Sequence, residues 1–184
     1  MTPASAARRY ARALFDVVLI QKGDLDRTQR ELEEFAALLH GDRAVASALM
    51  NPAVPAAKKR AVIDAIVTQS GDVSDPVART LSMLAERDRL GLTPDLARTF
   101  AERLMDHRNI VRAEVTTAIP LDAAKHKAIA DALGRATGRQ VVVEPKVDAG
   151  ILGGVVARVG SVVYDGSIAR QLEKMKESLV ESGQ

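Results

Sequence analysis

The sequence has no cysteine and no tryptophan, and aromatic residues make up only 3% of its 184 positions. The absence of cysteine excludes disulfide bonds, thiolate metal sites and cysteine nucleophiles. Because aromatic side chains are scarce, any hydrophobic core must be mainly aliphatic. No apolar run approaches the roughly 18 to 20 residues that a membrane-spanning helix needs. The 26 basic and 24 acidic residues nearly cancel, so composition gives only weak support for a polyanionic partner.

Helical spacing of apolar residues dominates the first half of the chain. The stripe that begins at Ala7 and runs unbroken through Val18 predicts a first helix. The Arg- and Ala-rich start has the composition of a transit peptide, but the unbroken stripe favours a structural helix. The same period predicts five more helices, with Asp24 and Ser74 as capping residues. Six helices with short connections before Asn109 predict a helical bundle.

Beyond Asn109 the apolar spacing changes from helical to alternating. Every second residue of 111–117 is apolar or small, which predicts a half-buried strand and the start of a second domain. A helix is expected after Pro120, and a second strand contains Pro145. Because proline cannot donate to a sheet ladder, that strand belongs at an edge or a bulge.

The C-terminal part combines a hairpin with a helix. Two apolar runs flank Gly160-Ser161, a pair that suits a two-residue II′ turn, and Ser167 is well placed to cap the helix that follows. We expect the apolar stripe of this closing helix, Ile168 to Leu179, to cover the hairpin. The predicted fold class is α+β: an N-terminal six-helix bundle over residues 1–109 and a smaller C-terminal α+β domain over residues 110–184, with the β-hairpin and the closing amphipathic helix.

No group of residues assembles a catalytic site. The three histidines lie in separate predicted elements without metal-ligand spacing, and no serine lies in a nucleophile elbow. Asp165 is expected to be a turn former that bonds its own backbone. The glycine-rich turn Gly150–Gly154 leaves a small nucleotide-binding protein or enzyme as an alternative, although its glycine spacing does not fit the dinucleotide fingerprint. We expect no catalytic residue, no cofactor and no metal, and favour an interaction protein.

Two basic clusters leave a nucleic-acid adaptor as a further alternative. Arg8, Arg9 and Arg12 lie in the first predicted helix, and Lys58 to Arg60 lie at the start of the fourth. No aromatic residues interleave with the second cluster to stack on bases, which favours a solvated helix face.

The first predicted helix is also a candidate docking surface. Small side chains around Tyr10 and Leu14 would let another helix approach closely, and tyrosine is favoured at interfaces. A helix-in-groove site is therefore reasonable. The same residues could equally pack the core of the bundle, and both interpretations stay open.

Three segments carry a resemblance to a known family: ARRYARALFD at 7–16, LAERDRL at 84–90 and GGVVARVGSVVYDGSIARQLEKMKESL at 153–179. In their order, and over essentially the whole chain, they resemble the delta subunit of the bacterial F-type ATP synthase, whose mitochondrial counterpart is the oligomycin-sensitivity-conferring protein. Ser161 and Ala169 stand where the family often has an acid and a base. The resemblance implies a non-catalytic stator subunit that links the catalytic head to the peripheral stalk, so that proton-driven rotation is coupled to ATP synthesis.

The resemblance also implies two binding regions. The N-terminal domain would grip the N-terminal helix of an alpha subunit in a groove between its first and fifth helices, lined by Tyr10, Ala13, Leu14, Arg79 and Met83. The C-terminal domain would hold the C-terminal end of the b subunit through a region that contains Gly154, Tyr164, Asp165, Gly166, Ser167 and Leu172. A single copy per complex would lie at the cytoplasmic face of the bacterial cell membrane, as a peripheral subunit that neither inserts into the bilayer nor binds nucleic acid.

Overall fold

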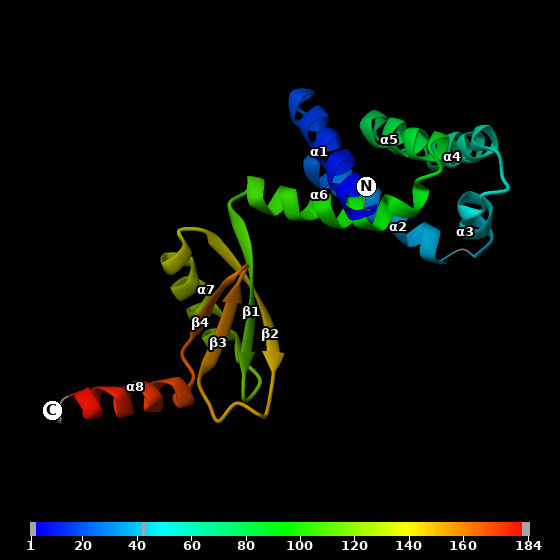
Figure 1. Ribbon diagram of the computed structural model, residues 1–184. Coiled ribbons are helices and arrows are strands. Elements are labelled where there is room, and N and C mark those ends of the chain that lie inside the picture. The colour runs from blue at the N-terminus through cyan, green and yellow to red at the C-terminus, as the bar shows by residue number, and fades with distance from the viewer. Residues whose placement is uncertain (1–2, 42, 182–184) are drawn as a thin grey trace. The chain divides into compact units, whose positions relative to one another are not determined.

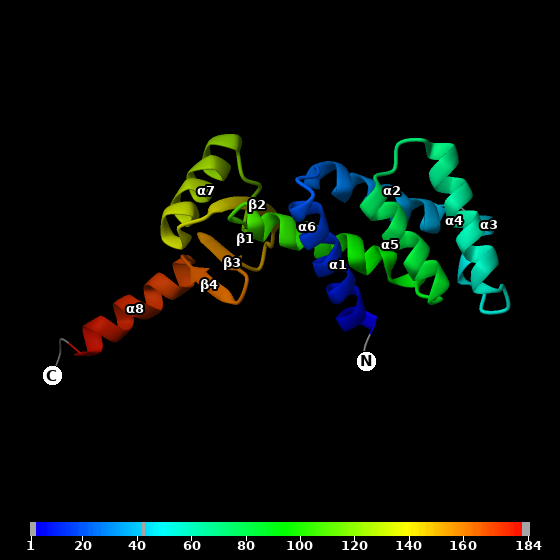
Figure 2. The same ribbon diagram turned by 90° about the horizontal axis from the view of Figure 1, so that it is seen from above.

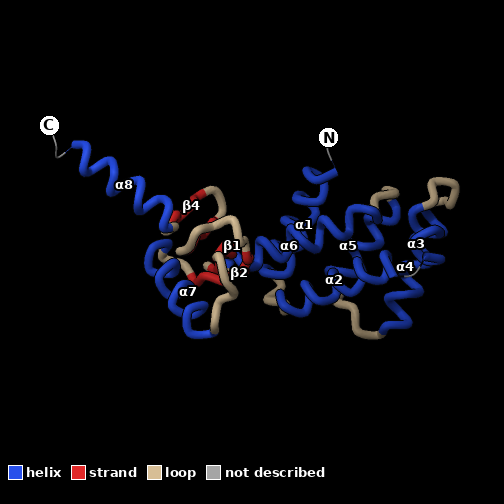
Figure 3. The backbone as a smooth tube through the Cα atoms, turned by 90° about the horizontal axis from the view of Figure 1, so that it is seen from below, coloured by secondary structure: helices blue, strands red, loops and turns tan. Residues whose placement is uncertain are grey.

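The computed structural model describes residues 3–41 and 43–181, with the side chains of 3, 174 and 177–181 outside the description. The chain separates into two compact units, Met1–Leu104 and Met105–Gln184. Within the described residues, the first unit is built from helices and the second contains a four-stranded sheet (Figures 1 and 3). Each unit has its own hydrophobic core. The α+β fold class predicted from the sequence is confirmed.

Helices of the first unit begin and end close to the positions that the sequence predicts. Asp24 caps the second helix as expected, because its Oδ1 accepts hydrogen bonds from the backbone N–H groups of Asp26 and Arg27 at 2.9 and 3.0 Å. A short 3-10 turn, η1 (Leu90–Leu92), precedes the last of these helices. Within the described residues, the α-helices of this part of the chain are α1 (Pro3–Ile20), α2 (Leu25–Gly41), α3 (Arg43–Met50), α4 (Ala56–Ser70), α5 (Asp75–Glu86) and α6 (Thr93–His107), whose last turn continues past Leu104.

The core of the first unit is mainly aliphatic, as the composition predicts. Leu32, Leu81 and Leu96 are fully buried in it. The rings of Phe15 and Phe100 meet edge to face, with 5.4 Å between their centroids, and join α1 to α6. Packing of this kind fixes the helices relative to one another within the unit.

Ser74 occupies the N-cap position of α5, but its side chain makes no capping hydrogen bond. Its hydroxyl donates instead to the carboxylate of Glu31 in α2, which also accepts the Ser74 backbone N–H at 3.1 Å and the Arg27 Nε at 2.8 Å. Glu31 is buried, so its charge needs these donors. The side-chain cap predicted for Ser74 is therefore wrong, because a buried acid competes for its hydroxyl.

The second unit contains one mixed sheet in the order β2-β1-β3-β4. β1 pairs with β2 in parallel, and the crossover between them is α7; β1 with β3 and β3 with β4 are antiparallel. Pro145 lies in β2, an edge strand, as predicted. Gly160, with φ +60°, turns the β3–β4 hairpin. The elements are β1 (Ile110–Thr117), α7 (Ala123–Thr137), β2 (Gln140–Val147), β3 (Val155–Val159), β4 (Val162–Asp165) and α8 (Ile168–Glu181).

The two faces of this sheet differ in chemistry. Ala113 and Val115 of β1 are buried in a core to which Leu133 of α7 contributes. The alternate residues are charged and exposed: Arg112 pairs with Glu144 at 3.3 Å and Glu114 with Lys146 at 3.5 Å. One face is therefore covered by α7, while the other carries charged side chains.

The closing helix α8 does not cover the hairpin. Its stripe residues Ile168, Leu172 and Met175 are 45%, 58% and 60% exposed, and α8 extends away from the end of β4 (Figures 1 and 2). The Leu179 side chain lies outside the described residues. The prediction of a covered hairpin is wrong because α7 already occupies the apolar face of the sheet and the other face is charged. Within the described residues, the apolar face of the sheet is thus already covered by α7, and the α8 stripe is exposed.

Candidate interaction sites

A groove between α1 and α5 brings together five residues that lie far apart in the sequence. Tyr10, Ala13 and Leu14 line it from α1, and Arg79 and Met83 from α5. Its volume is about 400 Å³. The remaining lining residues were not predicted from the sequence: Arg9, Val17, Gln21, Asp75, Pro76, Thr80 and Arg87.

The length of the groove follows from the helices that form its walls. Residues 9–21 supply one wall and residues 75–87 the other. At a rise of 1.5 Å per residue, each wall is about 18 Å long, which is the length of a three-turn helix. The helices α1 and α5 are in contact and run in opposite directions (Figure 2). Arg9 and Arg87 therefore lie at one end of the groove, and Gln21 and Asp75 at the other.

The groove has apolar side chains along its length and charged ones toward its ends, and it is partly open to solvent. Leu14 is buried at its base, whereas Val17 and Met83 are 41% and 40% exposed. Tyr10 packs against the core with part of its ring. Among the described residues its hydroxyl is buried and has no hydrogen-bond partner. Exposed apolar side chains in a concave site are typical of a surface that binds an apolar partner.

The end of α5 that carries Arg87 is fixed by an ion pair with α4. Asp88 follows the helix in the left-handed conformation, with φ +53°, and its backbone N–H bonds to the Ala85 carbonyl at 3.2 Å. The next N–H, of Arg89, reaches the Leu84 carbonyl at 2.8 Å, completing a Schellman motif. The Asp88 carboxylate accepts a hydrogen bond from the ammonium group of Lys59, and the Lys59 side chain is only 1% exposed. The groove wall is thereby held in place.

The glycine-rich turn of the second unit is a site of close backbone packing. A Cβ added at Gly154 would lie 2.5 Å from the Gly166 carbonyl oxygen and 2.9 Å from the Ser167 Cα. The two segments also bond to each other, Gly166 N–H to Val155 O at 2.9 Å and Ile168 N–H to Gly153 O at 3.1 Å. β3 rather than a helix follows the glycines, so they do not open a helix as the dinucleotide fingerprint requires.

Four of the six residues expected to face the stalk meet at this junction of β3, β4 and α8: Gly154, Asp165, Gly166 and Ser167. The Asp165 carboxylate accepts the Ser167 N–H at 2.9 Å, so it bonds its own backbone as predicted. The Ser167 hydroxyl caps α8 by accepting the Arg170 N–H at 3.3 Å. Tyr164 packs against the core of the unit, and Leu172 lies exposed on α8.

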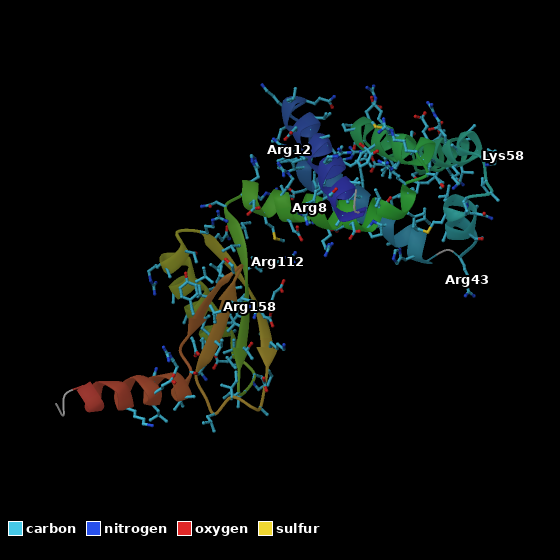
Figure 4. All side chains as sticks on the ribbon, viewed as in Figure 1. Arg8, Arg12, Arg43, Lys58, Arg112 and Arg158 are labelled. Carbon is cyan, nitrogen blue, oxygen red and sulfur yellow. The ribbon has the colours of Figure 1, made fainter. Side chains whose placement is uncertain are left out.

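The two basic clusters do not form one basic surface. Figure 4 shows Arg8 and Arg12 on α1 and Lys58 apart from them on α4. Arg12 pairs with Asp16 at 3.8 Å, and Arg60 pairs with Glu86 and Asp64. The expectation that the second cluster is a solvated helix face is wrong for Lys59, which is buried against Asp88. Among the described residues, acidic partners thus pair with Lys59 and Arg60 of the second cluster, but with only Arg12 of the first.

Within the part of the chain that the structure describes, no three histidine or acidic side chains are grouped so that they could hold a metal ion. Of the helices described, none has the length and apolar character needed to cross a bilayer. The candidate interaction surfaces are the groove in the first unit and the exposed apolar stripe in the second.

Comparisons with known proteins identify the family. The sequence model of the ATP synthase delta (OSCP) subunit matches residues 6–179. The chain belongs to this family. It is 38% identical over 179 residues to the ATP synthase subunit delta of Anaeromyxobacter sp. strain Fw109-5, covering 97% of this chain and 99% of that protein. It is also 38% identical over 180 residues to the subunit delta of Myxococcus xanthus strain DK1622, covering 97% and 98%.

A solved structure confirms the fold of this delta (OSCP) family member. One chain of the cryo-EM structure of the Toxoplasma gondii mitochondrial ATP synthase hexamer superposes with a TM-score of 0.58 and 24% identity, covering 95% of this chain and 97% of that one. The resemblance found in the sequence is confirmed, and with it the assignment to the ATP synthase complex. The binding roles of individual residues stay predictions.

Proposed function

We propose that this chain is the upper joint of the ATP synthase stator, and that its α1–α5 groove binds the N-terminal helix of an alpha subunit of the catalytic head. The family match over residues 6–179 supports the assembly, and the groove supports the site. An apolar surface about 18 Å long fits the apolar face of a three-turn amphipathic helix. Burial of exposed side chains such as Val17 and Met83 would supply the binding free energy.

The second unit is proposed to hold the C-terminal end of the b subunit. Ile168, Leu172 and Met175 form an exposed apolar stripe on α8, and such a stripe is stabilised when a partner covers it. The junction at Gly154 joins α8 to the sheet through backbone contacts and hydrogen bonds. Force applied to α8 would therefore reach the sheet through a fixed connection.

The proposed role is mechanical and non-catalytic. Rotation inside the head exerts torque on the ring of catalytic subunits, and the stator resists it so that proton flow drives ATP synthesis. The property that matters is then affinity for two partners. We propose one copy per complex, peripheral to the cytoplasmic face of the bacterial cell membrane.

A pull-down from host membranes tests this assignment. The tagged full-length chain should co-purify with alpha, beta and b subunits at low and at moderate salt. Recovery of nucleic acid instead, or of the chain alone, would contradict the proposal. The nucleotide-binding alternative is not supported by the geometry, since the glycine turn packs against backbone. The nucleic-acid alternative is not supported either, because Lys59 and Arg60 pair with acids and the two basic clusters lie apart (Figure 4).

A further inference from the structure

The charges around the α1–α5 groove are distributed unevenly along its length. Asp75, at one end, is engaged by Arg79 at 3.1 Å. At the other end lie Arg9 and Arg87, and within the described residues neither of these two side chains forms an ion pair. One end of an apolar groove therefore carries two uncompensated positive charges.

The acidic neighbours of Arg87 do not neutralise it, because both are paired with α4. Glu86 pairs with Arg60, and Asp88 pairs with the buried Lys59. These contacts draw the two carboxylates toward α4, whereas Arg87 lines the groove. Arg9 is likewise exposed, one position before Tyr10 on α1.

We propose that the helix bound in the α1–α5 groove carries a carboxylate at the end next to Arg9 and Arg87, so that charge fixes which end of the helix lies there. This inference rests on the proposed function and adds a specificity element to it. An apolar stripe alone permits either direction and several registers, because dispersion and hydrophobic burial are not directional. A carboxylate at one end of the bound helix distinguishes the two directions, since the reversed helix would leave both arginines without a partner.

Binding of the full-length chain to a synthetic peptide of the N-terminal segment of the host alpha subunit tests the inference. The test variant is the double substitution Arg9→Glu and Arg87→Glu. The matched control is Arg8→Glu with Arg89→Glu, which makes the same change in net charge at adjacent exposed positions that do not line the groove. Circular dichroism checks that both variants are folded.

We expect the groove variant to bind about 10-fold more weakly at low salt and the control variant to change by less than about 3-fold. The difference should shrink in high salt, because exposed charges are screened over roughly 10 Å or less. Replacing acidic residues of the peptide by lysine should weaken binding to the wild-type chain and restore binding to the groove variant. This charge swap separates a direct contact from a general effect of net charge.

The outcomes distinguish failure of the proposed binding site from failure of the charge-directed orientation. If the wild-type chain does not bind the peptide at all, the proposed function is contradicted at this site. If the wild-type chain binds but the groove variant binds equally well, or no more weakly than the control variant, the charge-directed inference is overturned while the groove assignment stands. Failure of the lysine peptide to rescue the groove variant would overturn it as well.

Discussion

The ammonium of Lys59 in α4 and the carboxylate of Asp88 after α5 form an ion pair in which the lysine is 1% exposed and the aspartate is half exposed. Asp88 has the left-handed conformation that ends α5 beside the groove, so the pair joins this helix end to α4. A buried ammonium is costly without a partner, so the stability of the first unit depends on this carboxylate.

Removal of the acidic member of this pair should cost more stability than removal of the basic member. Asp88→Asn keeps a residue that tolerates φ +53° but leaves Lys59 without its counter-charge, and we expect a loss of about 2 to 3 kcal/mol in the free energy of unfolding. Lys59→Met removes the buried charge and should be neutral within about 1 kcal/mol. Urea denaturation measures both. Asp16→Asn, at an exposed pair with Arg12, is the control, and an equal loss there would contradict the account.

Tyr10 should respond differently to a charge and to loss of its hydroxyl. Tyr10→Asp places a carboxylate in the apolar groove and should weaken binding of the alpha peptide by about 10-fold to 100-fold, which isothermal titration measures. Tyr10→Phe removes a buried hydroxyl that has no partner among the described residues, so stability should stay equal or rise by up to about 1 kcal/mol. Unchanged affinity of Tyr10→Asp would remove Tyr10 from the site.

Gly154 and Gly138 both have a positive φ, but only Gly154 is closely packed. Alanine substitutions at the two positions therefore distinguish the cost of a steric clash from the cost of backbone strain. Gly154, with φ +86°, has no room for a Cβ, whereas Gly138, with φ +68°, has no atom within 4 Å of that position. We expect Gly154→Ala to destabilise the second unit by about 3 kcal/mol and Gly138→Ala by only about 1 kcal/mol. Hydrogen exchange of the β1 amides reports the loss. Equal effects would show that packing at Gly154 contributes nothing.

The cap of α7 should give this helix a dependence on pH. The N–H of Lys125 donates to the Asp122 carboxylate at 2.7 Å and lowers the pKa of that side chain. A group whose pKa is lowered on folding stabilises the protein above its unfolded pKa, near 4, and this contribution is lost as the pH falls through the folded value. Asp122→Asn keeps a capping side chain that does not titrate, so its stability should vary less between neutral and acidic pH than that of the wild-type chain. Identical pH profiles would contradict this role.

Local patterns were sufficient to predict most of the fold. The Asp24 cap, the Gly160 turn and the edge position of Pro145 each depend on a few neighbouring residues and were predicted correctly. The sequence could not show that Lys59 is buried while its neighbour Lys58 is exposed. That difference depends on the rotational position of α4 and on Asp88, which lies 29 residues away.

The site is harder to predict than the fold, because it depends on which helices lie side by side. Tyr10 and Met83 were placed in one groove through family resemblance, whereas periodicity alone left Tyr10 equally able to pack the core of the bundle. The closing helix shows the same limit. Its apolar stripe predicted the helix correctly. Whether Leu172 packs within the chain depends on whether the apolar face of the sheet is free, and α7 already covers that face.

The central claim is that one chain joins the catalytic head to the stalk, and a bridging assay tests it most directly. The C-terminal segment of the host b subunit is immobilised, and capture of isolated catalytic heads is measured with and without the full-length chain. The account predicts that heads are retained only when the chain is present, and that Tyr10→Asp releases the heads while the chain itself stays bound. Retention of heads without the chain, or no retention with it, would contradict the claim.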